Sequence, residues 1–324
     1  MDSYTVLVTG ANGFIGSSLI ESLIKQGYKV FGTVRKAKAL VNSSGNSKNL
    51  IELNLESDNL YQDCVKLLPE VDCVVHLAGV AHNKNNSKAY VDKVNVEATK
   101  CIHAWSIYKN VKRFVYISSI GVNGNRSEKP FLEIDTPNPI NFYTLSKQRA
   151  EHIIKQSSKN KIEFVIIRPP LVYGVNAPGN FKKLLDFARN GVPLPLRLVN
   201  NKRSLISIGN LVNFISLCVN INNSPKAKNQ IFLVSDGRDI STYDLYRILL
   251  KSLNKSIWIP PFPVSIMKVV AKLFGKEEQS IGLFDSLQID NSKAERVLGW
   301  NAAISIEEEM NKIVKEVLKN EKKI

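Results

Sequence analysis

The segment from Tyr4 to Gln26 constrains the fold of this chain more than any other. Its first residues, 4–9, are rich in Val, Leu and Thr, which is typical of a buried strand. Glycines then stand at positions 10, 13 and 16, and apolar residues recur at positions 14, 15, 19, 20, 23 and 24. The second spacing is helical, and Gly27 stands where a glycine often ends a helix. The segment therefore predicts a strand, a tight turn and a helix from Phe14 to Gln26.

A strand, a glycine turn and a helix in this order can hold a pyrophosphate. Gly10 permits the sharp turn, Gly13 lets the backbone approach the phosphates, and Gly16 lets the helix pack closely on the strand. The N-terminus of the helix presents unpaired N–H groups and a partial positive charge to the phosphates. Three glycines alone also occur in purely structural loops. The strand before them and the helix after them favour binding of a dinucleotide.

Strand-like and helix-like segments alternate through the first half of the chain. Further strands are expected at residues 29–34, 50–53, 72–77, 113–118 and 163–168, long helices at 90–109 and 142–157, and a polar loop at 36–48. Such alternation predicts an α/β fold with a Rossmann-type, doubly wound parallel sheet. Ligands of such sheets bind at the carboxyl ends of the strands.

The pattern changes after residue 168, where prolines become frequent and helices are separated by irregular links. We expect residues 1–168 to form the dinucleotide-binding domain and residues 169–324 to form mainly a smaller substrate lobe. The segment from about 204 to 245 is expected to return to the sheet, because residues 231–234 have the pattern of one more strand. The C-terminal lobe is thus expected to be interleaved with the Rossmann domain.

Residues 262–276 form an amphipathic segment. Such a segment either packs its apolar face on the rest of its lobe or lies on a membrane surface. We expect the first alternative. The apolar residues that define the face are Ile266, Val269, Val270, Leu273 and Phe274.

The chain is strongly basic, with 44 Lys and Arg residues against 29 Asp and Glu residues and a formal net charge of +15. The basic residues are scattered, and no basic block alternates with aromatic residues, which argues against nucleic acid as a partner. A solvated surface that attracts an anionic small substrate is favoured over an acidic membrane surface.

No segment predicts export, membrane insertion or a metal site. The apolar runs are shorter than the ~18 residues of a transmembrane helix. The N-terminus leads directly into the first strand and leaves no room for a signal peptide. The four cysteines show neither close pairing nor metal-ligand spacing, and Cys73 and Cys218 lie in apolar runs typical of core residues. We expect a cytoplasmic protein.

Tyr143 and Lys147 occupy positions i and i+4 of the expected helix 142–157, so both side chains can reach one ligand. A phenol with a pKa of about 10 is a poor acid or base at neutral pH, and a nearby ammonium lowers that pKa. Ser119 stands at the end of the expected strand 113–118, where its hydroxyl can bond the substrate oxygen that Tyr143 protonates. Taken alone, a Tyr and a Lys at this spacing often form an ordinary surface pair, and a Ser at the end of a strand is often only a turn residue. Their order after the glycine loop favours a catalytic set.

The chain resembles the extended branch of the short-chain dehydrogenase/reductase superfamily, the NAD-dependent epimerases and dehydratases. The resemblance rests on Thr-Gly-Ala-Asn-Gly-Phe-Ile-Gly at residues 9–16, on Ser119 and on Tyr-x-x-x-Lys at residues 143–147. It implies that Tyr143 is the general acid/base and that Lys147 holds the nicotinamide ribose and tunes Tyr143. It also implies that Ser119, rather than Ser118, completes the triad, and that no metal is needed.

The same resemblance assigns residues to the dinucleotide. His76-Leu77-Ala78-Gly79 looks like the motif that lines the cofactor, and Asn95 matches an asparagine of the long helix. His76 as a metal ligand or base is the weaker alternative, since no partner stands at ligand spacing. The cofactor residues expected are Gly10, Asn12, Gly13, Phe14, Ile15, Gly16, Arg35, Asn54, Leu55, Leu77, Ala78, Gly79, Asn95, Tyr143, Lys147 and Pro170.

The end of the strand 29–34 departs from the pattern of NAD enzymes, which often carry Asp or Glu there to bind the ribose hydroxyls. This chain has Val34-Arg35-Lys36, and Arg35 could bind a 2′-phosphate. The prediction is therefore NADP(H), with NAD(H) as the alternative if Arg35 only stacks or faces solvent. Asn54 replaces an adenine-side Asp of the family and can still hydrogen-bond the base.

The second lobe carries residues that resemble the family's substrate site. Asn180 and Arg203 match residues that contact a diphosphate, and the fork of an Arg pairs well with phosphate oxygens. Leu194 matches the segment that flanks the uracil, and Ser119 belongs to both the catalytic and the substrate set. Taken alone, Arg203 is better explained as one more solvated charge of a basic chain.

A narrower resemblance concerns bacterial enzymes of surface polysaccharide (O-antigen or capsule) biosynthesis. Residues 167–174, 191–196, 200–205, 232–237 and 286–290 are similar to reductases that act on carbon 4 of UDP-2-acetamido-2,6-dideoxy-4-keto-hexoses and form UDP-N-acetylquinovosamine. The implied activity is NAD(P)H-dependent reduction of that ketone. The alternatives are a UDP-sugar 4-epimerase (UDP-GlcNAc/UDP-GalNAc or UDP-Glc/UDP-Gal) and a non-catalytic dinucleotide sensor, which would be expected to lack Tyr143 or Lys147. A homodimer through the helices around Asn95 and Tyr143 is also implied.

Overall fold

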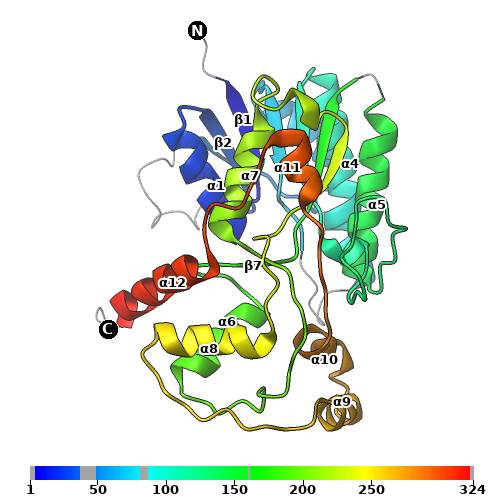
Figure 1. Ribbon diagram of the computed structural model, residues 1–324. Coiled ribbons are helices and arrows are strands. Elements are labelled where there is room, and N and C mark those ends of the chain that lie inside the picture. Colours follow the sequence, from blue (N-terminus) through cyan, green and yellow to red (C-terminus); the bar gives the residue numbers. More distant parts are fainter. Residues whose placement is uncertain (1–3, 37–48, 81–86, 160, 322–324) are drawn as a thin grey trace.

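A seven-stranded parallel sheet forms the centre of the computed structural model (Figure 1), which describes residues 4–36, 49–80, 87–159 and 161–321. The strand order is β3-β2-β1-β4-β5-β6-β9, so the chain winds outward from β1 in both directions. This confirms the predicted α/β, Rossmann-type fold class. The strands are β1 (Thr5–Thr9), β2 (Lys29–Val34), β3 (Leu50–Glu52), β4 (Cys73–His76), β5 (Arg113–Ile117), β6 (Glu163–Arg168) and β9 (Gln230–Leu233).

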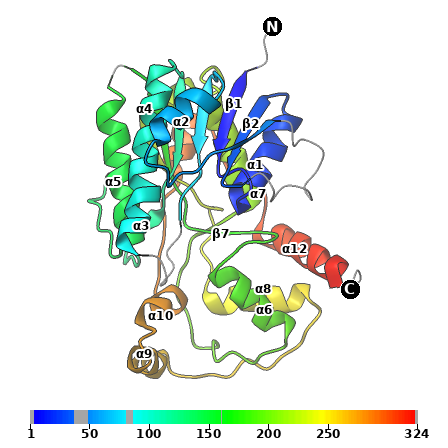
Figure 2. The ribbon, with the colours of Figure 1, turned by 180° about the vertical axis from the view of Figure 1, so that it is seen from behind.

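Helices cover both faces of the sheet because alternate strand residues point to opposite sides. Val6 and Val8 of β1 pack with Leu19 and Leu23 on one face, whereas Leu7 packs on the other. Figure 1 shows the first face and Figure 2 the second. The first face carries α1 (Phe14–Lys25), α7 (Ile208–Val219) and α11 (Ser292–Leu298); the second carries α2 (Leu60–Leu67), α4 (Ala98–Tyr108) and α5 (Phe142–Ser157).

The long helix expected at residues 90–109 is interrupted. It consists of α3 (Lys88–Asp92), a π-helical segment η3 (Lys93–Glu97) and α4. π turns of this kind often mark functional positions, since they re-aim one side chain. Asn95 lies within the π segment. The expected loop at 36–48 falls, after its first residue, outside the described residues.

A second, smaller lobe follows β6. It contains a two-stranded parallel sheet of β7 (Leu171–Tyr173) and β8 (Leu205–Ser207), which the sequence patterns did not indicate. Strand β9 returns to the large sheet beside β6, close to the predicted 231–234. The remaining elements are α6 (Asn180–Arg189), α8 (Thr242–Ser252), α9 (Val264–Leu273), α10 (Glu277–Phe284), α12 (Ile306–Glu321) and the short 3₁₀ turns η4 (Ile120–Val122) and η5 (Pro225–Ala227).

The expected packing of the amphipathic segment 262–276 is wrong. Helix α9 has no buried residue, and its apolar residues Ile266, Val269, Val270, Leu273 and Phe274 are 48%, 59%, 45%, 80% and 74% exposed. The reason is its position: α9 lies at the outer end of the lobe beside α10 (Figures 1 and 2), where only Val264 and Met267 reach the core of the lobe.

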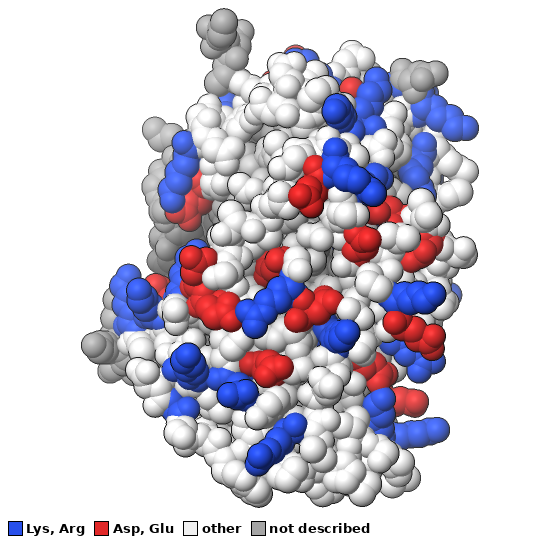
Figure 3. All heavy atoms as spheres, in the orientation of Figure 1, with Lys and Arg blue, Asp and Glu red and all other residues white. Residues whose placement is uncertain are grey.

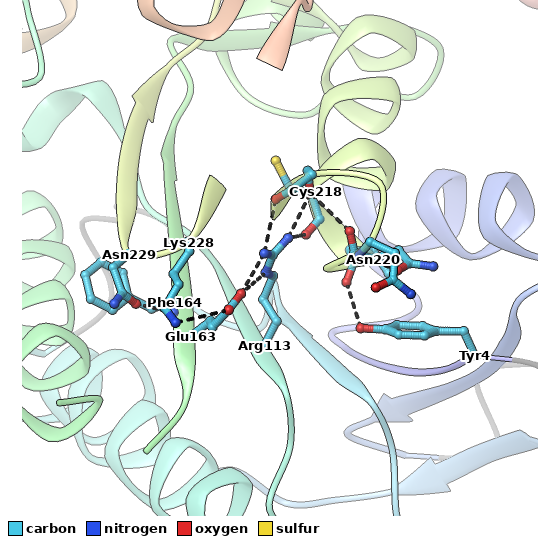
Figure 4. A network of polar contacts seen from close by, with 11 residues as sticks. Tyr4, Arg113, Glu163, Phe164, Cys218, Asn220, Lys228 and Asn229 are labelled. Atoms are coloured by element: carbon cyan, nitrogen blue, oxygen red, sulfur yellow. Dashed lines mark hydrogen bonds and ion pairs between the residues drawn. The ribbon is translucent and has the colours of Figure 1, made fainter. Parts of the chain in front are cut away.

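A polar network fastens the amino-terminal edge of the sheet (Figure 4). Arg113, the first residue of β5, is buried and donates to Glu163 of β6 at 2.6 Å, to Cys218 O at 3.0 Å and to Ser224 Oγ at 2.8 Å. The Tyr4 hydroxyl donates to Val219 O at 3.2 Å nearby. The network joins β5, β6 and the end of α7, and it leaves the opposite, carboxyl-terminal edge of the strands for ligands.

Candidate active site

The glycine turn after β1 has the geometry of a phosphate-binding loop. Gly10 has a φ of +71°, and a Cβ added at Gly16 would lie 2.2 Å from Gly10 O, so both positions require glycine. Helix α1 begins directly behind the turn, and its N-cap residue, Gly13, provides no side-chain cap. The first N–H groups of α1 therefore remain available to an anion. Asn12 and Gly13 are exposed at this end, and Phe14 and Ile15 are half-buried.

Ser119 and Tyr143 meet at the carboxyl end of β5. The Ser119 side chain lies near enough to the Tyr143 hydroxyl to lower the pKa of Tyr143, and Ser119 Oγ accepts from Gly121 N at 3.1 Å. The neighbouring Ser118 is turned away, since its hydroxyl donates to Glu151 at 2.5 Å in the interior. The fold thus separates the two serines, and only Ser119 lies beside Tyr143.

Helix α5 begins so that Tyr143 and Lys147 fall on its inner side. The Asn141 side chain accepts from Thr144 N at 2.9 Å and forms a capping box, which fixes the first turn. Lys147 Nζ donates to Ile117 O at 2.9 Å and lies 4.8 Å from the centroid of the Tyr116 ring. Burial lowers the pKa of Lys147 to about 8, against the opposing effect of Glu151.

The expected lowering of the Tyr143 pKa by Lys147 is not found in this structure. Burial raises the Tyr143 pKa to about 12, although the nearby Ser119 side chain acts in the opposite direction. The reason is the direction of the ammonium, which is bonded to Ile117 O rather than to the phenol. Tyr143 is therefore protonated at neutral pH, the form that donates a proton.

Asn95 holds the loop after β4 against α5. Its amide accepts from Val80 N at 2.8 Å and donates to Val80 O at 3.1 Å and to Ser146 Oγ at 3.0 Å. A Cβ added at Gly79 would lie 3.0 Å from the Asn95 amide oxygen and 3.5 Å from Lys147 Nζ, so Gly79 lines the same space as Lys147. Leu77 and Ala78 precede it, and Ala78 N donates to Thr9 Oγ1 at 3.1 Å. Sequence reasoning missed Thr9 and Ser146, whose roles depend on these long-range contacts.

His76 is a structural residue. Its ring nitrogens lie 2.7 Å from Thr9 Oγ1 and 2.9 Å from Thr99 Oγ1, and the ring is fully buried. Burial lowers its pKa to about 3. No group of three or more His, Cys, Asp or Glu residues that could hold a metal occurs within the described ranges.

Arg35 is the first residue after β2, and its side chain is exposed at the carboxyl edge of the sheet. Its guanidinium donates to the Tyr90 hydroxyl at 3.1 Å and lies 3.8 Å from Glu56. Tyr90 and Glu56 were not singled out from the sequence, because only the fold brings α3 and the loop after β3 to β2. Asn54 follows β3, and its side chain accepts from Glu56 N at 3.0 Å, with Leu55 between them.

Two of the three expected substrate residues of the second lobe lie together in the structure. Asn180 and Arg203 line one small cavity of the second lobe, together with Leu171, Thr242, Gly282 and Leu283. Arg203 is half-buried, donates to Asp285 O at 3.0 Å and has a pKa lowered by burial. Leu194 is not among the residues that line this cavity; it packs with the core of the lobe. Pro170 is buried between β6 and β7.

Comparison with known proteins agrees with this geometry. The model of the NAD-dependent epimerase/dehydratase family matches residues 6–233. The chain is 37% identical over 313 residues to a UDP-glucose 4-epimerase of Vibrio cholerae, covering 94% of this chain and 92% of the relative. The chain belongs to the NAD-dependent epimerase/dehydratase family.

The chain is also similar to an Escherichia coli O157:H7 N-acetyl-α-D-glucosaminyl-diphospho-ditrans,octacis-undecaprenol 4-epimerase, with 24% identity over 84% of this chain and 81% of the relative. Among solved structures, Thermotoga maritima UDP-glucose 4-epimerase with UDP-glucose has a TM-score of 0.76 at 23% identity, covering 98% of this chain and 99% of that chain. The Bordetella bronchiseptica enzyme WbmG with NAD and UDP has a TM-score of 0.75 at 17% identity, covering 98% and 96%. Likeness at this identity supports the fold.

The residues of the glycine turn fit the dinucleotide that the family name implies. A side chain at Gly16 would collide with Gly10 O, and the uncapped start of α1 offers N–H groups to phosphates. Lys147 and Gly79 lie next to each other at the carboxyl edge of the sheet, beyond the glycine turn. Within the described parts of the chain, no helix is long and apolar enough to span a membrane.

Proposed function

We propose that this enzyme transfers hydride to carbon 4 of a UDP-linked 2-acetamido-2,6-dideoxy-hexos-4-ulose in surface-polysaccharide precursor synthesis. The observation that carries the proposal is the position of Ser119 beside a protonated Tyr143, on the same side of α5 as the buried Lys147. These groups suit the reduction of a ketone, because the carbonyl oxygen must gain a proton as carbon 4 gains hydride.

The roles of the residues follow from their protonation states. Reduced nicotinamide, when bound, supplies the hydride. Tyr143 donates its proton to the ketone oxygen, and Ser119 donates a hydrogen bond to the same oxygen. Lys147, charged below about pH 8, stabilises the developing phenolate and binds the ribose of the cofactor. The second lobe holds the UDP group, with Asn180 and Arg203 on the diphosphate.

The cofactor residues proposed are those of the glycine turn, residues 10 and 12–16, with residues 77–79, Asn95, Tyr143, Lys147 and Pro170 at the nicotinamide side. Asn54 and Leu55 are proposed for the adenine side. We propose NADP(H) over NAD(H), since no carboxylate follows β2 directly and Arg35 can bind a 2′-phosphate. Glu56, at 3.8 Å from Arg35, opposes this preference in part. The crystal structure of WbmG is a complex with NAD. The experiment below therefore tests both NADPH and NADH.

A UDP-sugar 4-epimerase is the second candidate. The name of the Vibrio cholerae relative favours it, at 37% identity. An epimerase would use the same three residues, oxidise carbon 4 and return the hydride to the other face. It would also have to retain its nicotinamide through each cycle. The lack of a carboxylate directly after β2 argues against such tight retention.

The deciding experiment has two parts. The purified protein is denatured, and released nicotinamide is measured by absorbance. NADPH or NADH is then added with a UDP-4-keto-6-deoxy-N-acetylhexosamine, with Y143F as the matched control. Little released cofactor and stoichiometric oxidation, lost in Y143F, support the reductase. Tightly bound NAD, no oxidation of added cofactor, and interconversion of UDP-GlcNAc with UDP-GalNAc, or of the glucose counterparts, would make the protein an epimerase.

We also propose a homodimer through α4 and α5. Phe142 and Leu145 of α5 and Tyr108 of α4 are exposed apolar residues, but much of the adjoining surface is charged, with Glu97, Lys100, Arg149 and Lys155. Sedimentation of the purified protein decides between monomer and dimer.

A further inference from the structure

One end of the molecule presents an exposed apolar surface, which we call the α9 face. Ile266, Val269, Val270 and Leu273 follow helical i, i+3, i+4 and i+7 spacing, so they lie on one side of α9. Phe262 before the helix and Phe274 after it extend the surface, and the six side chains are between 41% and 80% exposed. Such a continuous apolar surface on an exposed helix indicates an interaction site.

The charged residues of the segment that forms the α9 face are all lysines, and the first acidic residue, Glu277, begins the next helix, α10. Residues 258–276 contain Lys268, Lys272 and Lys276 and no Asp or Glu. Lys268 is paired with Asp285, whereas Lys272 and Lys276 are exposed to solvent. In Figure 3 the lower end of the molecule, where α9 lies, is largely uncharged, and basic side chains with a few acidic ones lie next to it. An apolar stripe bordered by lysines matches a surface that is apolar below and anionic above.

A second copy of the chain fits this surface poorly. Its six apolar side chains, which are 41–80% exposed, together offer on the order of several hundred Å², below the about 800 Å² per partner of a stable dimer. Two copies paired through α9 would also bring the lysines of both copies together. The small size and the positive border suit a bilayer, which takes up a single helix face and carries negative charge.

We propose that the α9 face docks on the surface of an anionic lipid bilayer. The apolar side chains enter the boundary between headgroups and acyl chains, and Lys272 and Lys276 contact lipid phosphates. The position of α9 at the end of the molecule (Figures 1 and 2) lets it reach a flat surface ahead of the Rossmann domain. Helix α10, which packs on α9, supplies Gly282 and Leu283 to the cavity of Asn180 and Arg203, so docking brings that cavity close to the lipid.

Co-sedimentation with vesicles tests the docking and does not depend on the substrate proposed above. The full chain is mixed with vesicles of phosphatidylcholine alone or with phosphatidylglycerol added. We expect binding to the anionic vesicles only, weakened by salt. The variant V269E/L273E should lose at least about tenfold in vesicle partitioning, and K272E about fivefold. L67E is the matched control, since Leu67 is 44% exposed and lies on α2, at the opposite end of the molecule from α9 (Figure 2); it should bind like the wild type.

Thermal unfolding and NADPH binding of each variant verify that the exposed substitutions leave the fold intact. Absence of wild-type binding to anionic vesicles, or equal binding of V269E/L273E, overturns the proposal. A change in oligomeric state of V269E/L273E without vesicles would also overturn it, because the face would then belong to a second copy.

Discussion

Lys147 is the residue whose chemistry is most sensitive to its surroundings. Its ammonium is held by Ile117 O and the Tyr116 ring, yet burial lowers its pKa to about 8. The Tyr143 pKa of about 12 lies well above that of Lys147, so the lysine is the first of the two to lose a proton as pH rises.

We therefore predict that kcat/KM for ketone reduction is level near neutral pH and falls as pH rises through about 8, since the free enzyme then loses the Lys147 charge. The effect of pH on the free energy of unfolding through Lys147 has the opposite sign. Between about pH 8 and 10.5, the ordinary pKa of a lysine, the folded state binds fewer protons than the unfolded state, so the Lys147 contribution to stability increases with pH. K147R, which keeps its charge, should lack the decline. A profile that stays level well beyond pH 8 would contradict the assignment.

At the scale of elements, a buried ion pair joins α5 to the sheet. Arg168, the last residue of β6, donates to both carboxylate oxygens of Glu151 at 2.8 and 2.6 Å and to Asn123 Oδ1 at 2.9 Å. Both partners of the pair are almost fully buried. Ser118 adds a third donor to Glu151, so the network lies directly behind the catalytic Ser119 proposed here.

Removal of Arg168 alone should be strongly destabilising. We expect R168M to lose about 3–5 kcal/mol of unfolding free energy, because Glu151 would remain as an uncompensated buried charge. The double variant R168M/E151M should recover most of that loss, since no unpaired charge remains. Chemical denaturation measures both. A loss below about 1 kcal/mol in R168M, or a double variant no better than the single one, would show that the pair does not act in this way.

The sequence was sufficient for features set by local pattern, and insufficient for those set by contacts across the fold. The glycine turn could be predicted because its turn and close packing require Gly10 and Gly16, and helix α5 was predicted with its bounds, Phe142–Ser157. The π turn at Asn95 and the bond of Ser118 to Glu151 depend on partners distant in sequence, and the choice of Ser119 over Ser118 came from the family resemblance alone. The exposure of α9 was also beyond prediction, because periodicity identifies an apolar face without showing what covers it.

At the scale of the whole molecule, the two lobes divide the ligands that we propose. The carboxyl edge of the large sheet carries the glycine turn, Tyr143 and Lys147. The second lobe carries Arg203, a half-buried guanidinium that bonds the backbone carbonyl of Asp285, whose carboxylate is itself paired with Lys268. A cation in such surroundings is suited to pair with an anionic ligand, since burial strengthens the interaction.

Substitution of Arg203 should therefore separate the two binding events. We expect R203Q to raise KM for the UDP-sugar by about tenfold to a hundredfold, the value of one hydrogen bond between charged groups, and to leave the dissociation constant of NADPH unchanged. R238Q is the control, because Arg238 is an exposed arginine of the same lobe, paired with Glu307 at 2.7 Å, and lies outside the cavity. Steady-state kinetics and NADPH fluorescence titration measure the two constants. If R203Q weakened NADPH binding as much as UDP-sugar binding, or left KM unchanged, Arg203 would not be the residue that couples the second lobe to the substrate.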